Sequence, residues 1–557
     1  MTAGDAELGF RWAAALFDGL ARSGVRRVVA SPGSRSTPLT LAALRRPDIK
    51  THVVLDERSA GFFALGLAKA EKRPVVLIAT SGSAVANWAP AVVEADMAKV
   101  PLILISADRP PELQNCGANQ TMDQIGLFGR HVRAFHALPP PEGEDGWLSD
   151  FAARVVEQSR FPVAGPVHVN APFREPLAPR DASPCSSGAK RPEVLHGRST
   201  LDTPQLERVA ALLRGRGVIF CGPEDLGEDF RDDVVALARR LNAPIVADIL
   251  SGLRFDGRDD PRILAFPDWI ARAAPRFDWA LRFGPAPVGK AVHSWLRANA
   301  AAVQIVVAED GRFADPDRIA SHFLAADPAA LCRALAAAPA PDDWLEALLA
   351  RDRSARRNAE AVCAAGPLFE GGLLRALFQS TPDDATLFLA NSLVIRAAEW
   401  FCGAAARRIA CFGNRGLSGI DGNLSTACGL ASARGRVVAV LGDLAFLHDV
   451  NALLLARELP LTIVVMDNGG GGIFDHLPQN ALPEFERGWR TPQVFDVAAL
   501  ARSFGLDYRR VENGAEGVAA VAESLNAPGA TLVHAVIDPR LSLSLCRTFF
   551  ATSQENA

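Results

Sequence analysis

The chain predicts an α/β protein of three doubly wound domains. Short apolar segments alternate with helical segments in three separate stretches, and two Pro-rich stretches interrupt this alternation. At 557 residues the chain is also too long for a single hydrophobic core. We expect domains at residues 1–180, 204–338 and 367–557, separated by a linker at 181–203 and by a linker with a helix at 339–366.

The first domain is predicted from its buried strands. Residues 28–30, 75–79 and 102–105 are short runs of Val, Leu, Ile and Ala, as expected for parallel strands that are covered on both faces. Residues 60–69 have a helical pattern and lie between the first two strands. Residues 174–203 are rich in Pro, Ser, Gly and charge, a composition that cannot form a core and therefore predicts a linker.

Apolar runs also place the other two domains. The central domain is expected to begin near Leu206, with strands at 217–220 and 244–247. The sequence Ala-Pro-Ala-Pro-Asp-Asp at 338–343 marks its end. An amphipathic helix from Trp344 then leads into the third domain.

Composition narrows the class of protein. Apolar residues make up 49% and charged residues 22% of the chain, and a net charge of −4 gives no reason to expect a nucleic-acid partner. No apolar run reaches the length of a membrane span, and the N-terminus lacks the pattern of a signal peptide. The nine cysteines are scattered without any Cys-x-x-Cys pair, which argues against disulfide frameworks and zinc sites. We therefore expect a cytoplasmic protein with reduced cysteines.

Two oxygen-bearing side chains in the third domain predict a metal site. Asp443 follows an apolar strand at 437–441, and Asn468, 25 positions later, follows the next strand at 460–466. Residues 449–459 have the length of a crossover helix, so both side chains are expected at the carboxyl edge of one parallel sheet. Carboxylate and amide oxygens suit Mg²⁺, which then still has room for phosphate oxygens and water.

A glycine run supports this interpretation. Residues 469–472 let the backbone approach a metal and phosphates without a Cβ clash, and the carbonyl of Gly470 is the expected third protein ligand. Gly-Asp-Leu alone is an ordinary strand-to-helix turn, and Asp-Asn-Gly alone is an ordinary tight turn. At this spacing after two apolar strands, they together predict thiamine diphosphate with Mg²⁺ (or Mn²⁺).

A second acidic residue, Glu57, lies far away in the first domain. On its own it is equally an acid in the first turn of a helix, interacting with the helix dipole. If it lies beside the predicted cofactor site, Glu57 is a candidate for general acid–base catalysis. A cofactor that touches both domains lies in a cleft between them, so we expect a homodimer or homotetramer, although two domains of one chain could also face each other.

Seven motifs carry a resemblance to a known family. They are Ser31–Leu39 (SPGSRSTPL), Thr80–Asn87 (TSGSAVAN), Ala107–Leu113 (ADRPPEL), Gly117–Gln120 (GANQ), Asn391–Arg396 (NSLVIR), Asn414–Gly422 (NRGLSGIDG) and Gly442–Leu444 (GDL). The sequence closely resembles the 2-succinyl-5-enolpyruvyl-6-hydroxy-3-cyclohexene-1-carboxylate synthases of menaquinone biosynthesis. The resemblance implies pyrimidine-binding, central and diphosphate-binding domains of the thiamine diphosphate-binding fold.

The resemblance is dense in the first and third domains and thin in the middle, chiefly at Gly289 and Lys290. Gly-Asp-Leu replaces the Gly-Asp-Gly of most thiamine diphosphate enzymes. Ala291 stands where several family members carry a second basic residue after Lys290. If that cation contributes to isochorismate binding, either affinity is weaker here or Arg282 or another residue compensates.

The resemblance also implies the reaction. A member of this family decarboxylates 2-oxoglutarate and adds the succinyl carbanion equivalent to isochorismate in a Stetter-like conjugate addition, giving the cyclohexene carboxylate product and CO₂. Glu57 is expected to hydrogen-bond the aminopyrimidine nitrogen, and Ile420 is expected to lie under the cofactor and keep it bent. Glu57, Gln120 and Ser392 are the expected catalytic residues.

Both substrates are dicarboxylates, so the site needs several fixed cations, and the planar guanidinium of arginine suits carboxylates. By the matched motifs, Arg396 and Arg415 are expected near 2-oxoglutarate, and Arg35 and Lys290 near isochorismate. The remaining expected substrate-binding residues are Arg109, Ser34, Asn119, Gln120 and Ser392.

Two alternatives remain open. Another thiamine diphosphate decarboxylase or carboligase, such as a relative of acetolactate synthase, is disfavoured because pyruvate has a single carboxylate and would not need these arginines. A non-catalytic relative is possible in principle because a fold does not fix an activity. The intact Glu57, Asp443 and Asn468 argue against it.

Overall fold

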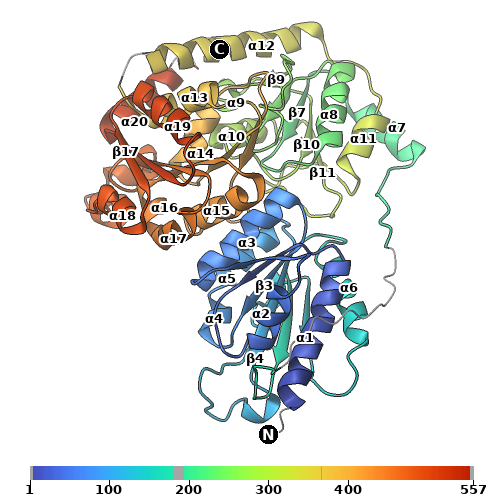
Figure 1. Ribbon diagram of the computed structural model, residues 1–557. Helices are drawn as coiled ribbons and strands as arrows, with labels where there is room; N and C mark the ends of the chain where they lie inside the picture. Colours follow the sequence, from blue (N-terminus) through green and yellow to red (C-terminus); the bar gives the residue numbers. More distant parts are fainter. Residues whose placement is uncertain (1–3, 181–193, 365–366, 552, 554–557) are drawn as a thin grey trace.

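The computed structural model describes residues 4–180, 194–364, 367–551 and 553. It contains three six-stranded sheets, and every strand pair in them is parallel. Helices cover both faces of each sheet (Figure 1). The predicted architecture of three doubly wound α/β domains is therefore confirmed.

The first sheet has the strand order β2-β1-β3-β4-β6-β5. Its strands are β1 (Arg27–Ala30), β2 (Lys50–Val53), β3 (Val75–Ala79), β4 (Leu102–Asp108), β5 (Ala134–Ala137) and β6 (Val167–Pro172). The helices are α1 (Gly4–Arg22), α2 (Thr37–Leu44), α3 (Glu57–Glu71), α4 (Ser83–Ala86), α5 (Ala89–Met97) and α6 (Trp147–Gln158). α1, α2 and α6 pack on one face, whereas α3 and α5 pack on the other.

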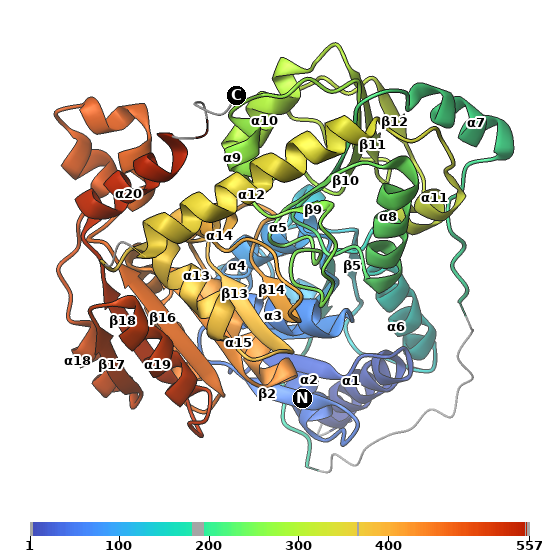
Figure 2. The same cartoon turned by 90° about the horizontal axis from the view of Figure 1, so that it is seen from above.

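The central sheet has the order β12-β11-β10-β7-β8-β9. Its strands are β7 (Gly217–Cys221), β8 (Ile245–Ala247), β9 (Ile263–Leu264), β10 (Trp279–Phe283), β11 (Val303–Val307) and β12 (His322–Leu324). Its helices are α7 (Thr203–Leu212), α8 (Glu228–Leu241), α9 (Pro267–Ala271), α10 (Lys290–Ala298) and α11 (Pro328–Ala334). The long helix α12 (Asp342–Ala364) then lies across the central and third domains (Figure 2).

The third sheet has the order β14-β13-β15-β16-β18-β17. Its strands are β13 (Ala385–Leu389), β14 (Ile409–Phe412), β15 (Val437–Gly442), β16 (Leu461–Asp467), β17 (Asp507–Val511) and β18 (Thr531–Val536). Its helices are α13 (Glu370–Ser380), α14 (Leu393–Phe401), α15 (Asn423–Arg434), α16 (Asp443–His448), α17 (Leu453–Ala456), α18 (Val497–Phe504), α19 (Gly514–Ser524) and α20 (Pro539–Ala551). None of the described helices is both long and apolar enough to span a bilayer.

The connection between β15 and β16 differs from the expected single helix at 449–459. It consists of α16, a 3-10 turn at 450–452 and the short helix α17. The break occurs at Asp449, whose backbone is not helical and whose fully buried carboxylate accepts hydrogen bonds from the backbone N–H and the hydroxyl of Ser425. These bonds to α15 compete with continued helix formation, as is typical of aspartate.

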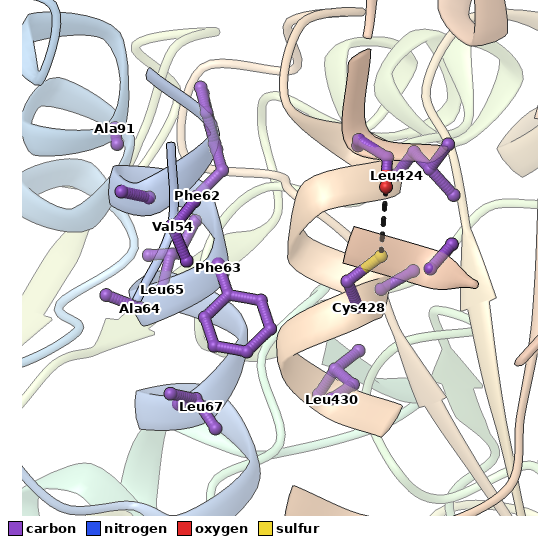
Figure 3. Packing of buried hydrophobic residues seen from close by; sticks show 14 of the residues in the cluster. Val54, Phe62, Phe63, Ala64, Leu65, Leu67, Ala91, Leu424, Cys428 and Leu430 are labelled. Carbon is purple, nitrogen blue, oxygen red and sulfur yellow. Dashed lines mark hydrogen bonds between the residues drawn. The ribbon is translucent and has the colours of Figure 1, made fainter. Parts of the chain in front are cut away.

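The first and third domains share one hydrophobic core. The apolar faces of both sheets meet through α3 and α15, which lie side by side between the two domains (Figures 1 and 3). The backbones approach closely at two glycines, because a Cβ on Gly66 would lie 2.1 Å from the carbonyl oxygen of Thr426 and one on Gly429 would lie 2.1 Å from that of Phe63. The two domains therefore form one packed unit within the chain.

Substituting Gly66 by alanine tests this contact. The methyl group must push α3 and α15 apart, and we expect a loss of about 3 kcal/mol of stability, as for other overpacked cores. Gly514 of α19 is the matched control, because its Cβ would meet no atom within 4 Å. Calorimetric unfolding of Gly66→Ala should show a lower midpoint, and that of Gly514→Ala should be unchanged. An unchanged midpoint for Gly66→Ala would contradict the close packing.

Candidate functional site

The predicted site residues gather at the carboxyl edges of two sheets. In the third domain, β13, β14, β15 and β16 end just before Ser392, Arg415, Asp443 and Asn468, respectively. Because the strands are parallel and adjacent, all four residues lie on the same edge.

Asp443 is the first residue of α16 and is 4% exposed. Its two carboxylate oxygens accept hydrogen bonds from the backbone N–H groups of Leu444 at 2.8 Å and Gly470 at 2.6 Å. Burial, with a smaller contribution from the neighbouring Asp467, raises the pKa of Asp443 to about 6. Each oxygen retains acceptor capacity for a cation, which would stabilise the charged form.

Asn468 follows β16 and is 7% exposed. Its Nδ2 donates to the carboxylate of Glu370 at 2.7 Å, whereas its buried Oδ1 has no hydrogen-bond partner among the described residues. Glu370 is itself buried and accepts a second hydrogen bond from Ser542. A buried oxygen without a partner is costly unless something binds it, so Asn468 Oδ1 fits a metal ligand.

The glycine run is held in place by Arg490. The guanidinium donates to the carbonyl of Asn468, and the carbonyl of Arg490 accepts from Gly471 N–H at 2.7 Å. A Cβ on Gly470, whose φ is +128°, would lie 2.2 Å from the oxygen of Arg490. Only glycine fits there, and the loop that carries the Gly470 carbonyl is thereby fixed next to Asp443.

Arg396 and Arg415 form a pair of neighbouring cations. Burial, and for Arg396 also the charge of Arg415, lowers their pKa values from the usual arginine range. Arg396 donates to the carbonyl of Ser392 at 2.7 Å, and Arg415 donates to Asn391 Oδ1 at 2.7 Å. Neither forms a salt bridge with a carboxylate of the described residues. Two adjacent guanidinium groups of this kind favour an anion between them.

The first domain presents a second pair. Arg109, after β4, lies near Arg35, and its pKa is lowered by burial and then by the charge of Arg35. Arg109 donates to the hydroxyl of Ser81. Arg35 is buried and donates to the carbonyl of Phe173 at 2.9 Å and to Glu175 at 2.8 Å.

The three uncharged residues predicted to bind substrate in the first domain are exposed to solvent. Ser34, Asn119 and Gln120 are all exposed. Gln120 donates through Nε2 to the carbonyl of Ser81 at 3.2 Å, and its own carbonyl accepts from the hydroxyl of Ser81. The structure therefore brings Gln120 and Arg109 together on Ser81.

Two predicted catalytic residues have unusual backbone conformations. Ser392 has φ +66° and Gln120 has φ +53°, although neither is glycine. Such left-handed residues cost of order 1–3 kcal/mol each and concentrate at functional sites.

Glu57 is the first residue of α3 and is half-buried. Its side chain forms no hydrogen bond or salt bridge with any described residue, and so none with Asp443 or Asn468. Its neighbour Arg58 instead donates to the carbonyl of His448, at the far end of α16 from Asp443. The Glu57 carboxyl is therefore presented on the edge of the first sheet without a partner in the part of the chain that the structure describes.

Two other expected residues lie on different elements. Lys290 is exposed at the start of α10 in the central domain, and Ile420 is half-buried in the loop before α15. Arg282 is buried in β10 and forms a salt bridge with Asp315 at 2.9 Å, so the suggestion that it compensates for Ala291 is wrong. A cation that is already neutralised inside a sheet is not available to a ligand.

Some residues of the site were missed by sequence reasoning. Glu370, Asn391 and Arg490 contact predicted residues from distant parts of the chain, and no spacing pattern indicated them. Asn391 was inside a recognised motif, which was the only available signal.

Comparisons with known proteins agree with this geometry. Residues 10–127 match the "Thiamine pyrophosphate enzyme, N-terminal TPP binding domain", residues 189–389 the "Middle domain of thiamine pyrophosphate", and residues 400–535 the "Thiamine pyrophosphate enzyme, C-terminal TPP binding domain". The 2-succinyl-5-enolpyruvyl-6-hydroxy-3-cyclohexene-1-carboxylate synthase of Dechloromonas aromatica (strain RCB) is 42% identical over 95% of this chain and 98% of its own. The chain belongs to this synthase family of thiamine pyrophosphate enzymes.

Further relatives support the assignment. The synthase of Geobacillus kaustophilus (strain HTA426) is 42% identical over 94% of both chains. The crystal structure of benzoylformate decarboxylase from Polynucleobacter necessarius has a TM-score of 0.73 and covers 95% of this chain and 98% of its own. At 18% identity it shows the fold alone. Membership of the family establishes thiamine diphosphate as the cofactor class of these domains.

Asp443→Asn tests the site at the third sheet. Both carboxylate oxygens accept from N–H groups, so an amide would turn its NH₂ toward one of these donors and remove the negative charge. We expect thiamine diphosphate binding in the presence of Mg²⁺, measured by isothermal titration calorimetry, to weaken at least about a hundredfold. The control is Asp507→Asn, an exposed residue of β17 in the same domain. Equal binding by both variants would exclude Asp443 as a ligand.

Proposed function

We propose that this chain catalyses the decarboxylation of 2-oxoglutarate and the conjugate addition of its succinyl part to isochorismate, giving 2-succinyl-5-enolpyruvyl-6-hydroxy-3-cyclohexene-1-carboxylate and CO₂. The observation that carries the proposal is the set of two arginine pairs at the carboxyl edges, Arg35 with Arg109 and Arg396 with Arg415. Two dicarboxylate substrates require several fixed cations. The names of relatives with 42% identity support the same reaction.

The third domain would hold the diphosphate end of the cofactor. Asp443, the orphaned Oδ1 of Asn468 and the carbonyl of Gly470 are suited to Mg²⁺ (or Mn²⁺), with phosphate oxygens as the remaining ligands. Ile420 would support the cofactor from the loop before α15. Bound thiamine diphosphate supplies the electron sink for loss of CO₂ and for formation of the new carbon–carbon bond.

Glu57 would hold and exchange a proton at the aminopyrimidine nitrogen. The Glu57 carboxyl has no hydrogen-bond or salt-bridge partner among residues 4–180, 194–364, 367–551 and 553, which leaves it available for this task. Gln120 and Ser392, at the two edges, would bind the reacting parts of the substrates. Both have positive φ angles, a strained backbone conformation of the kind that concentrates at functional sites.

The two substrates would bind to different groups of residues. Arg396 and Arg415 would bind the carboxylates of 2-oxoglutarate, with Ser392 as a neutral partner. The other substrate-binding residues would face isochorismate, and they are Ser34, Arg35, Arg109, Asn119, Gln120 and Lys290. An arginine that forms no salt bridge among the described residues gains most from a substrate carboxylate, which favours Arg109, Arg396 and Arg415 as the strongest contacts.

A complete site would need a second copy of the chain. Within one chain, α3 docks on the end of α16 that lies away from Asp443, and the side chain of Glu57 forms no hydrogen bond with Asp443, Asn468 or any other described residue. Val53 and Leu55, just before Glu57, are more than half exposed, as is Leu417 near Arg415. Exposed apolar residues around a polar site are typical of an interface. We propose a homodimer at least, with the homotetramer as the alternative, in the cytoplasm.

Activity with defined components tests the reaction. Purified protein should consume isochorismate only when 2-oxoglutarate, thiamine diphosphate and Mg²⁺ are all present. Glu57→Gln should lower the rate at least about a hundredfold, because the amide cannot exchange the proton. Glu71→Gln, on the same helix and salt-bridged to Arg27, is the matched control.

The result separates the alternatives. Release of CO₂ from 2-oxoglutarate without consumption of isochorismate would indicate a decarboxylase or a different acceptor. Binding of the cofactor without turnover of any 2-oxo acid would indicate a non-catalytic relative.

A mixing experiment tests whether the site is shared between subunits. Glu57→Gln and Asp443→Asn should each be inactive alone. If each site takes Glu57 from one subunit and Asp443 from the other, random reassociation restores about a quarter of the wild-type activity, since about half of the dimers are hybrids with one intact site. If both residues came from one chain, the mixture would stay inactive. Reassociation is checked with differently tagged subunits.

A further inference from the structure

The first domain forms hydrogen bonds with a loop of the third domain that carries one of the proposed substrate-binding arginines. The loop at residues 413–422 connects β14 to α15 and carries Arg415. Two charged side chains of the first domain contact this loop directly: Lys69 of α3, whose side chain is 11% exposed, and Glu94 of α5, which is buried. They play no part in the site described above.

Glu94 binds the backbone on the C-terminal side of Arg415. Its Oε1 accepts from Gly416 N–H at 2.8 Å, and its Oε2 accepts from Leu417 N–H at 2.6 Å. Gly416 also packs tightly against α5, since a Cβ there would lie 2.7 Å from the carbonyl oxygen of Glu94 and 3.0 Å from Ala98 N. A carboxylate that accepts two N–H groups holds a loop in one conformation.

Lys69 binds the backbone on the other side of Arg415. Its Nζ donates to the carbonyl of Gly413 at 2.8 Å and to Asn414 Oδ1 at 2.9 Å. The ammonium lies 3.8 Å from Glu94 Oε1, so the two buried charges compensate each other. Burial lowers the pKa of Lys69, and Glu94 opposes that shift. Arg415 is thus held between two anchors from the same domain.

The anchored loop fixes the guanidinium through Asn391. Nδ2 of Asn391 donates to the carbonyl of Asn414 at 2.7 Å, and its Oδ1 accepts from Arg415 Nη1 at 2.7 Å. The buried Nε of Arg415 has no hydrogen-bond partner among the described residues. A donor in this state is ready for an anionic oxygen.

We propose that Lys69 and Glu94 are positioning residues that hold Arg415 for a substrate carboxylate; this inference rests on the proposed function. The first domain then has two tasks. Its sheet edge presents Glu57 to a cofactor, and its helices α3 and α5 set the substrate arginine of their own chain. The contact between the first and third domains of one chain would therefore contribute to substrate affinity, although it does not bind the cofactor.

The test compares the two charges that hold the loop with charges at neighbouring positions that bind other partners. Lys69→Met and Glu94→Gln remove the anchors, and the double variant avoids leaving one charge buried alone. Lys72→Met, with a 65% exposed side chain, and Glu71→Gln are the matched controls. Hydrogen–deuterium exchange of a peptide covering 413–422, the KM of each substrate, kcat and the cofactor affinity are measured on the full protein.

We expect faster exchange across 413–422 in the anchor variants and a KM for 2-oxoglutarate raised about tenfold, as for loss of a charge-assisted hydrogen bond, with cofactor affinity unchanged. The controls should behave as wild type. Unchanged exchange, or lower thermal stability and kcat without a selective rise in KM, would overturn the inference. If the wild type consumes neither substrate, the proposed function fails, while the exchange data still decide whether the anchors hold the loop.

Discussion

The close packing of α3 against α15 is the constraint on which the arrangement of this molecule depends. Neither helix is amphipathic in the ordinary sense, because residues 59–68 and residues 423–431 are buried without interruption. Helices that are buried all round must lie between two apolar layers, here the inner faces of the first and third sheets. Gly66 and Gly429 at the crossing let the two backbones approach closely, and this packing fixes the position of the first sheet relative to the third.

Charge is concentrated where this packing leaves the sheet edges open. Arg109, Arg396, Arg415 and Asp443 are all partly or largely removed from water, and none of them forms a salt bridge with a described residue. Such groups cost stability in the free protein and recover it when a ligand of opposite charge binds. The hydrophobic cores of the domains supply the stability that offsets this cost in the free protein.

The central domain stabilises the position of helix α14 in the third domain. Arg254, fully buried after β8, forms a salt bridge with Glu399 of α14 at 2.6 Å, and Ile249 N–H also donates to Glu399. α14 is the helix that carries Arg396. Burial and the charge of Asp248 keep the pKa of Glu399 well above its usual range, whereas Arg254 opposes the shift. The position of one substrate arginine therefore depends on a domain that contributes little to the sheet edges.

The sequence by itself determined the three-domain α/β class, seven buried strands at 28–30, 75–79, 102–105, 217–220, 244–247, 437–441 and 460–466, and the candidates Glu57, Asp443 and Asn468. It could do so because parallel strands covered on both faces are continuous apolar runs, and because side chains that follow such strands fall on one edge. Local patterns could not determine the broken crossover at Asp449, whose carboxylate bonds to another helix. They also could not find Glu370, 98 positions from Asn468, or Glu94, 322 positions from Gly416. Only the tertiary structure decided these contacts, because a hydrogen bond between distant segments leaves no periodic signal in either.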